Sequence, residues 1–326
     1  MKIAVYSPNW VGDAALALPF IHQLKNQNPD SKIIIVCKKW VESVFYNNPC
    51  VDDIVSLSAN DVRGIVNTVR TGVVLKEKEI DYFYTLTDSF RSAIIMWLSG
   101  ATHRIGYNTQ KRSVLMSSTI DLPSKTIHRS KKYLNIIKSK VLDLDEKYIH
   151  LNQDEIGWAK EKMREYNIVN PVAVFPFSVA SSRTFPKHKI NEWFSGSSEQ
   201  YVIFGAENDR NNATEIIEQN EDITIHSFCG EYDLRKSIAL MSVCKYAIAA
   251  DSGLGHISSI LGIPTVSFFG AGRSSVTKPI GRQNVVIDKS ERCNPCKKNI
   301  CCLNVIKKSD VNYAIESLHL DSQFEV

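Results

Sequence analysis

The chain of 326 residues alternates short apolar runs with amphipathic segments from its first residues onward. Runs rich in β-branched or aromatic residues occur at 2–6, 32–37, 53–57 and 80–86. Such runs are typical of strands that are buried on both faces of a parallel sheet. Helical patterns lie between or after them at 18–27, 62–78 and 89–101. This alternation predicts a parallel sheet with helices on both of its faces.

The same pattern starts again in the second half of the chain. An amphipathic helix at 154–168 is followed by predicted strands at 171–177, 200–206, 223–228, 246–251 and 265–271, and the last predicted helix covers 310–320. We therefore expect an α/β protein with two doubly wound domains, residues 1–150 and 151–326. Ligands of such sheets bind beyond the carboxyl ends of the strands, so the residues directly after strands are the candidates for function.

Composition narrows the class of protein. Hydrophobic residues make up 44% and charged residues 23% of the chain, as in a soluble globular protein. The net charge of +4 does not indicate nucleic acid, but it allows an anionic partner at a local basic surface. We see no secretory signal, and the longest apolar stretch, "SAIIMWLSGA", is too short to cross a bilayer. We expect a cytosolic protein, in which the eight cysteines are reduced.

The stretch "SPNWVGDAAL" at 7–16 places Asp13 where a strand gives way to a helix. In one interpretation Asp13 is a helix N-cap, a position that favours Asp. In the other, the helix begins close to Pro19, because a proline inside a helix costs about 3 kcal/mol. Asp13 would then lie on the preceding loop, where its carboxylate could act chemically at the edge of the sheet.

A second stretch, "AADSGLGHISSILGIP" at 249–264, follows an apolar run. Ser252 and Gly253 open a helix that carries His256, and the amides at a helix start can bind an anion. Asp251 can accept hydrogen bonds from sugar hydroxyls. The alternative is a capped helix with a hydrogen-bonded histidine.

A third stretch, "FPFSVASSRTFPKHK" at 175–189, combines serines such as Ser178 with a basic cluster of Arg183, Lys187 and Lys189. Hydroxyls, loop amides and a guanidinium suit a diphosphate. The alternative is a solvated loop.

A fourth stretch, "VIFGAENDRN", places Glu207 and Asp209 just past a predicted strand, where either acid could hold a ribose diol or belong to a surface turn. The dinucleotide fingerprint fails, because "GAGRSS" has Ser275 in place of the third glycine. Neither a P-loop nor a nucleophile elbow occurs in the sequence.

The stretch "CNPCKKNICC" concentrates Cys293, Cys296, Cys301 and Cys302. A C-x-x-C pair with further cysteines nearby could bind zinc. However, adjacent residues such as Cys301 and Cys302 do not easily point at one tetrahedral ion. The alternative is a set of thiols packed under a loop.

Three stretches of the sequence together resemble glycosyltransferase family 9, the bacterial lipopolysaccharide heptosyltransferases. They are "PNWVGDAALALP", which is closest to the version in heptosyltransferase II, "DSFRSAIIMWLSGATHRIGY" and "DSGLGHISSILGIPTVSFFGAG". Their order is that of the family, and the resemblance extends from residue 2 to about 305. It implies a GT-B fold, with two Rossmann-like domains that face each other across a cleft. The N-terminal domain would bind the acceptor and the C-terminal domain the donor, and the last helix, about 309–320, would cross back to the N-terminal domain.

The resemblance also implies a reaction: inverting transfer of L-glycero-D-manno-heptose from ADP-heptose to the inner core of lipid A-linked oligosaccharide. The enzyme would be cytoplasmic and peripheral at the inner face of the bacterial inner membrane, with an anionic membrane surface as a partner, no nucleic acid and no cofactor. Asp13 would be the general base. The second, third and fourth stretches above would supply the donor contacts, and the acceptor contacts would come from Trp10, Gly12, Ser89, Arg91 and Arg104. The donor contacts would be Ser178, Arg183, Lys187, Glu207, Asp209, Asp251, Ser252, Gly253 and His256. Related members also carry cysteine-rich loops like 293–302.

The sequence departs from the family pattern at several positions. Residues 183–186 read Arg-Thr-Phe-Pro where Lys-Arg-Trp-Pro is usual, Ala250 replaces an Asn, and Asp88 replaces the Asn before Ser89. The exact donor and acceptor therefore stay open. The alternatives are a family 9 transferase that uses another sugar donor, a nucleotide-sugar epimerase of the same fold, and a non-catalytic nucleotide-sugar-binding module.

The N-terminal half also carries many basic residues within "HRIGYNTQKR" and "HRSKKY". We expect part of this set to meet acceptor phosphates or the anionic membrane surface, where each basic residue contributes about 1 kcal/mol. The alternative is a solvated basic face. The set consists of His103, Arg104, Lys111, Arg112, Arg129, Lys131 and Lys132.

Overall fold

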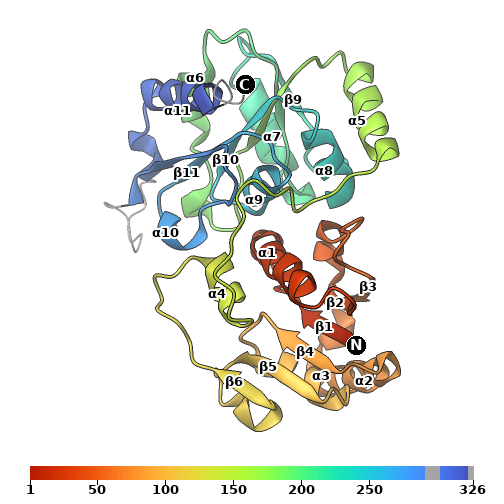
Figure 1. Ribbon diagram of the computed structural model, residues 1–326. Coiled ribbons are helices and arrows are strands. Elements are labelled where there is room, and N and C mark those ends of the chain that lie inside the picture. The colour runs from red at the N-terminus through yellow and green to blue at the C-terminus, as the bar shows by residue number, and fades with distance from the viewer. Residues whose placement is uncertain (291–301, 322–326) are drawn as a thin grey trace. The chain divides into compact units, whose positions relative to one another are not determined.

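Two α/β units make up the chain, each built on its own six-stranded parallel sheet (Figure 1). The structure is a computed structural model that describes residues 1–290 and 302–321. The N-terminal unit is Met1–Asp143 and the C-terminal unit is Leu144–Val326. In Figure 1 the colour of the N-terminal unit runs from red to yellow, and that of the C-terminal unit ends in blue.

The N-terminal unit has the strand order β3-β2-β1-β4-β5-β6, which is that of a Rossmann-like sheet. Its elements are β1 (Lys2–Tyr6), α1 (Val11–Gln27), β2 (Lys32–Lys38), η1 (Lys39–Val44), β3 (Asp53–Leu57), η2 (Asn60–Val62), α2 (Gly64–Val74), η3 (Leu75–Lys78), β4 (Tyr82–Thr85), α3 (Phe90–Leu98), β5 (His103–Tyr107), η4 (Arg112–Leu115), β6 (Ser118–Ile120) and α4 (Arg129–Asn135).

The C-terminal unit has the order β12-β11-β10-β7-β8-β9, the same arrangement of six strands. Its elements are α5 (Gln153–Glu165), β7 (Val172–Phe175), η5 (Ser181–Arg183), α6 (Lys187–Phe194), β8 (Tyr201–Ile203), η6 (Glu207–Asp209), α7 (Arg210–Glu218), β9 (Ile225–Ser227), α8 (Leu234–Met241), β10 (Tyr246–Ala250), α9 (Gly253–Ile260), β11 (Thr265–Phe269), α10 (Ser274–Thr277), β12 (Asn284–Asp288), η8 (Cys302–Val305) and α11 (Lys308–Asp321).

Burial on both faces of the sheets explains the nearly continuous apolar strands. In the N-terminal sheet, Ile3 and Val5 point to one face, and Ala4 and Tyr6 point to the other, where they join a core with residues of α3. Strand β1 pairs in parallel with β2 on one side and with β4 on the other. The carboxyl ends of neighbouring strands therefore meet at one edge of the sheet.

The C-terminal core is rich in aromatic side chains. Phe185, Trp193 and Phe268 pack together with ring centroids 4.8–5.2 Å apart. The Trp193 indole donates a hydrogen bond to the carbonyl of Ile306, 3.0 Å away, which fixes the chain just before α11. α11 contacts α6, β11 and β12 of its own unit. Its crossing to the other domain stays a prediction.

The alternation of strands and helices is confirmed, and the largest error concerns α1. The sequence predicted a helix at 18–27, but α1 begins at Val11 and has Pro19 inside it. The reason is burial: residues 14–21 of the helix are all buried, and each fully buried aliphatic side chain contributes about 1.5–3 kcal/mol. Several such residues outweigh the cost of one proline. Strands β5, β6 and β12 were not predicted.

Candidate functional site

Each sheet has one place where the strand order changes direction, and the predicted site residues follow the strands there. In the N-terminal unit this switch point lies between β1 and β4, which precede Asp13 and Ser89. In the C-terminal unit it lies between β7 and β10, which precede Arg183 and Asp251. Ligands of open α/β sheets bind at such points.

Asp13 occupies neither of its two predicted positions. The N-cap of α1 is Trp10, which makes no side-chain capping bond, and Asp13 lies in the first helical turn. A carboxylate in the first turn is stabilised by the helix dipole by about 0.3–1 kcal/mol. The early helix start therefore places the Asp13 charge at the positive end of α1.

Helix α4 supplies the other charge beside Asp13. The Nε atom of Arg129 lies 3.5 Å from the Oδ1 atom of Asp13, and the two side chains are 32% and 26% exposed. The Tyr133 hydroxyl lies next to this pair. Burial raises its pKa well above the usual value, and the negative charge of Asp13 adds to the rise. The helix dipole and Arg129 both favour ionised Asp13, which stays partly accessible.

The other predicted acceptor residues follow β1 or β4 at the same edge, except Arg104, which lies near the amino end of β5 at the opposite edge. Ser89 is the N-cap of α3 and its Oγ accepts a hydrogen bond from the backbone N–H of Arg91 at 3.2 Å. Arg91 and Trp10 are exposed, Trp10 to 62%. Gly12 lies in the first turn of α1. Arg104 donates to the carbonyls of Leu115 and Ala101 at 2.9 and 2.5 Å, which favours a structural role for its guanidinium.

The predicted basic set does not form one solvated face. Arg112 is fully buried, and its guanidinium donates to the carbonyls of Tyr107 and Thr87, so it cannot meet a membrane or an acceptor phosphate. Lys132 pairs with Asp88 at 2.9 Å, and thus offsets the negative charge that replaces the family's Asn. His103 stacks on Tyr82. Lys111 and Lys131 are exposed.

In the C-terminal unit, a buried carboxylate and an arginine meet at the switch point. The Oδ2 atom of Asp251 lies 3.3 Å from Nη1 of Arg183, and the Asp251 side chain is only 4% exposed while that of Arg183 is 43% exposed. The Ser178 hydroxyl donates to the backbone carbonyl of Asp251 at 3.0 Å. The loops after β7 and β10 are thereby tied together, and the Arg183 guanidinium is left partly exposed.

Two residues of this site were missed by the sequence reasoning. The Thr184 Oγ1 atom accepts a hydrogen bond from the Ser178 backbone at 3.1 Å, which holds the loop after β7. Gly272 lies against Asp251: a Cβ at residue 272 would come 2.1 Å from the Asp251 Oδ2 atom. In the sequence, Gly272 belongs to a failed dinucleotide fingerprint and to a stretch that resembles the family, but it was not predicted as a site residue. Its place directly after a strand was the available signal.

Helix α9 begins beside Asp251. Ser252 is its N-cap and accepts from the backbone N–H of Gly255 at 3.4 Å, and Gly253 is the first helical residue. His256 is buried, 6% exposed, in the next turn. Both the capped-helix interpretation and an anion site at this helix start are compatible with the geometry.

The remaining donor candidates have partners that point to structural roles. The Lys187 ammonium pairs with Glu215 of α7. Asp209 accepts from the backbone N–H of Ala206 at 2.9 Å, as in a turn. Glu207 accepts from Arg210 at 2.9 Å on an exposed surface. Their donor contacts stay predictions, and so does the proposed zinc cluster, because Cys293, Cys296 and Cys301 lie outside the described residues and Cys302 is the first residue of η8.

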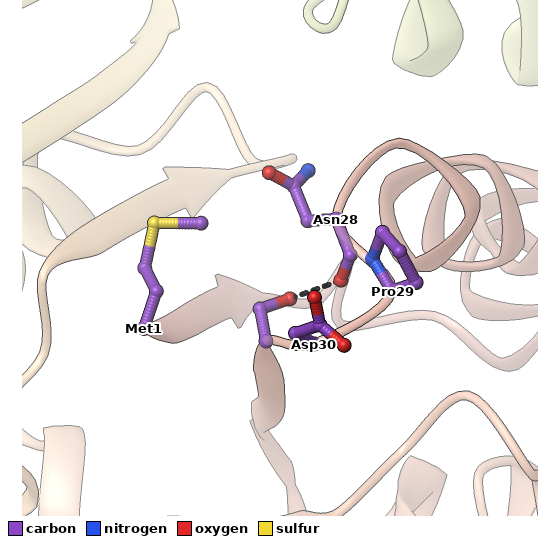
Figure 2. Close-up of a pocket in the computed structure, with 5 residues that line it drawn as sticks. Met1, Asn28, Pro29 and Asp30 are labelled. Carbon is purple, nitrogen blue, oxygen red and sulfur yellow. Dashed lines mark hydrogen bonds between the residues drawn. The ribbon is translucent and has the colours of Figure 1, made fainter.

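A small pocket near the N-terminus is not a competing site. Figure 2 shows Met1, Asn28, Pro29 and Asp30 around it, with Ser31 donating a 2.6 Å hydrogen bond to the carbonyl of Asn28. These residues precede β1 and β2. The pocket therefore lies at the amino ends of the strands, the edge opposite to that at which open α/β sheets bind ligands.

Comparison with known proteins adds two relatives over nearly the whole chain. Lipopolysaccharide heptosyltransferase 2 of Escherichia coli is 23% identical over 305 residues, which cover 88% of each chain. Lipooligosaccharide heptosyltransferase 2 of Campylobacter jejuni is 25% identical over 334 residues, which cover 98% of this chain and 99% of the relative.

Solved structures agree in fold. The structure of Escherichia coli ADP-heptose lipopolysaccharide heptosyltransferase II has a TM-score of 0.80 at 22% identity and covers 99% of this chain and 100% of its own. A family 9 glycosyl transferase from Veillonella parvula has a TM-score of 0.85 at 22% identity, with 98% and 97% covered. These matches confirm the predicted α/β, GT-B class with two Rossmann-like domains.

The sequence profile described as Glycosyltransferase family 9 (heptosyltransferase) matches residues 69–307, more than half of the chain. The match covers β4, β5 and β6 of the N-terminal sheet and the whole C-terminal sheet, and it includes Ser89, Arg183 and Asp251. The chain therefore belongs to glycosyltransferase family 9, the heptosyltransferases, and is a glycosyltransferase.

Proposed function

We propose that the chain transfers L-glycero-D-manno-heptose from ADP-heptose to the inner core of a lipid A-linked oligosaccharide, with inversion at the anomeric carbon. The observation that carries the proposal is the pair of Arg183 and Asp251 at the C-terminal switch point. A partly exposed guanidinium suits the donor diphosphate, and a buried carboxylate beside it suits a hydroxyl of the sugar or ribose. The names of the heptosyltransferase 2 relatives support this choice of sugar and acceptor.

The C-terminal unit would stabilise the leaving group. As the bond from the sugar to the diphosphate breaks, negative charge grows on the ADP oxygen. Arg183 can hydrogen-bond this charge, and the N-terminus of α9, which starts at Gly253, carries a favourable dipole. Neither group needs to reorganise during the reaction, since the contacts to Asp251 and Ser178 fix the loops.

Asp13 of the N-terminal unit would be the base. It accepts the proton of the acceptor hydroxyl while the hydroxyl oxygen forms a bond to the anomeric carbon, and ADP departs with the electron pair of the bond that breaks. An aspartate carboxylate is a weak base at neutral pH, because its usual pKa is about 3.9. It suffices when the proton leaves late, after the attacking oxygen has become acidic.

Product analysis tests this function directly. The purified chain is incubated with ADP-heptose and a heptose-deficient inner-core acceptor, and the products are separated by mass. The proposal predicts ADP and an acceptor heavier by one heptose. A modified nucleotide sugar without transfer would indicate an epimerase, turnover only with another nucleotide sugar would indicate a different donor, and binding without turnover would indicate a binding module.

We also propose that the enzyme works as a peripheral protein at the cytoplasmic face of the inner membrane. Among residues 1–290 and 302–321, no helix combines the length and apolar character needed to cross a bilayer. Helix α2 offers a surface for docking instead, because its small and polar side, with Thr68 and Gly72, is buried, while Ile65 and Val66 are 81% and 80% exposed.

The close packing of α2 against α3 explains why the small residues of α2 are buried and its larger apolar residues are exposed. A Cβ at residue 72 would come 2.6 Å from the Cβ of Leu98 in α3. The exposed apolar side also includes Val69 and Val73, and Arg63 and Arg70 are exposed beside it. Aliphatic side chains with flanking arginines suit an anionic lipid interface.

Flotation with liposomes tests the membrane proposal. The double variant Ile65→Gln and Val66→Gln should lose binding to vesicles that contain anionic lipid, whereas Val169→Gln, which changes an equally apolar side chain of the C-terminal unit that is 71% exposed, should keep it. Binding that depends on neither the double variant nor the anionic lipid content would contradict the proposal.

A further inference from the structure

Lys38, the last residue of β2, has an unusual environment. Its side chain is 7% exposed, and its Nζ atom is buried with no hydrogen-bond partner among the described residues. A buried ammonium without a partner costs several kcal/mol. The chain therefore holds a cation in a position that does not help its own folding.

Arg91 adds a second positive charge to the surroundings of Lys38. Burial lowers the pKa of Lys38, and the charge of Arg91 lowers it further. Asp61 acts in the opposite direction, but its carboxylate already accepts a hydrogen bond from the backbone N–H of Ser58 at 2.7 Å. Arg91 also acts on the hydroxyl of Tyr6, whose pKa burial raises to about 12. Lys38 and Arg91 are thus close enough for their charges to interact, and Arg91 interacts electrostatically with the Tyr6 hydroxyl as well.

The location is that of a ligand site. Lys38, Tyr6 and Arg91 follow or end β2, β1 and β4, three neighbouring strands, at their carboxyl edge. Trp40 covers the ammonium, with its ring centroid 5.8 Å from Nζ, and its indole donates to the carbonyl of Asn9 at 2.7 Å, which ties the loops after β2 and β1 together. Trp40 remains 49% exposed, so that an aromatic face borders the site.

We propose that Lys38 and Arg91 form a subsite that binds an anionic group, a phosphate or a carboxylate, of the acceptor. The inference rests on the proposed function for the identity of the acceptor, but not for the presence of the subsite. An anion between the two cations would relieve their repulsion and give the Lys38 ammonium a hydrogen-bond acceptor, which it lacks among the described residues. The subsite lies beside the loop before α1, so a bound anionic group would orient the acceptor relative to Asp13 of the same unit.

Acceptor kinetics test which molecule carries the anion. Lys38→Met removes the charge and keeps the length of the side chain. We expect the acceptor KM to rise about 10- to 100-fold for an anionic inner-core acceptor, as for loss of a charge-assisted hydrogen bond. The donor KM should stay unchanged, and a dephosphorylated, carboxyl-reduced acceptor should show no such rise. Lys32→Met is the matched control, because Lys32 is exposed at the other end of β2.

Thermal unfolding with inorganic phosphate tests the subsite without any transfer reaction. At constant ionic strength, phosphate should raise the Tm of the wild-type chain and of Lys32→Met more than that of Lys38→Met, because ligand binding stabilises the folded state. If phosphate acts equally on all three, the subsite does not exist. If phosphate acts as predicted but the acceptor KM of Lys38→Met is unchanged, the subsite exists but does not bind the acceptor. The claim that the acceptor carries the anion is then wrong. A chain that transfers no heptose would refute the proposed function, and the phosphate result would still decide on the subsite.

Discussion

Gly272→Ala is a small change with a large expected effect on donor binding. The new Cβ would lie 2.1 Å from Oδ2 and 3.1 Å from Cγ of Asp251, and 3.4 Å from a ring carbon of Phe269. Since carbon and oxygen atoms normally approach no closer than about 3.3 Å, the carboxylate must move by about 1 Å. Asp251 is buried, so this movement lengthens its 3.3 Å contact with Arg183 or displaces the loop after β11.

The magnitude follows from these contacts. Overpacking a buried site costs about 1–3 kcal/mol of unfolding free energy. If ADP binding depends on the position of Arg183 beside Asp251, its Kd should rise about 10- to 100-fold, the equivalent of one charge-assisted hydrogen bond.

Calorimetric titration with ADP and urea unfolding measure the two effects. Gly157→Ala is the control, because nothing lies within 4 Å of a Cβ at this helical glycine of α5. This control should bind ADP normally and gain about 0.5–1 kcal/mol of stability. A Gly272→Ala variant as stable as the wild type, with an ADP affinity within a few-fold of it, would refute the reasoning.

Three further predictions concern other charged residues. Arg183→Met should weaken ADP binding about 10- to 100-fold, measured by calorimetry, if the guanidinium bonds the diphosphate directly; an unchanged affinity would remove it from the site. Arg112→Met should lower the unfolding free energy by about 3–5 kcal/mol, because the carbonyls of Tyr107 and Thr87 lose a buried charged donor; urea unfolding of a variant as stable as wild type would contradict this. The pKa of Lys38 is lowered in the folded state, so the unfolded chain binds more protons as the pH rises toward 10.5. The stability of the wild type relative to Lys38→Met should therefore increase between neutral pH and that value, and a constant or falling difference in urea unfolding would contradict the assignment.

Hydrophobic pattern was enough to predict most strands of both sheets, because strands buried on both faces and amphipathic helices leave clear periodicities. The pattern failed at the start of α1, where the free-energy cost of one proline competes with the burial of many side chains. Pro19 suggested a late start for α1, and only packing of the whole helix shows that the gain exceeds that cost. Strand β6 left no apolar run, because its residues Ser118–Ile120 are exposed or only half-buried.

The candidate site was predictable where polar residues follow strand ends. The structure places Asp13, Arg183 and Asp251 after strands at the two switch points, and their roles stay predictions. The cluster of basic residues led to a wrong prediction for Arg112. Its guanidinium is buried and donates to the carbonyl of Thr87, which is distant in sequence, and this contact leaves no pattern near Arg112. Lys38 was overlooked for the converse reason: "KKW" after a strand is typical of a surface, but Lys38 continues the alternation of Ile34 and Val36 toward the buried side of the sheet.

The central claim is that Asp13 takes the proton of the acceptor hydroxyl. Asp13→Asn keeps the size of the side chain, and because the ion pair with Arg129 is partly exposed, its loss should cost no more than about 1 kcal/mol of stability. ADP affinity should not change. The decisive measurement is kcat of the folded variant at saturating ADP-heptose and acceptor. A base role predicts a decrease of about 10²- to 10⁴-fold. A kcat within a few-fold of wild type would contradict it and leave Asp13 a structural role in the first turn of α1.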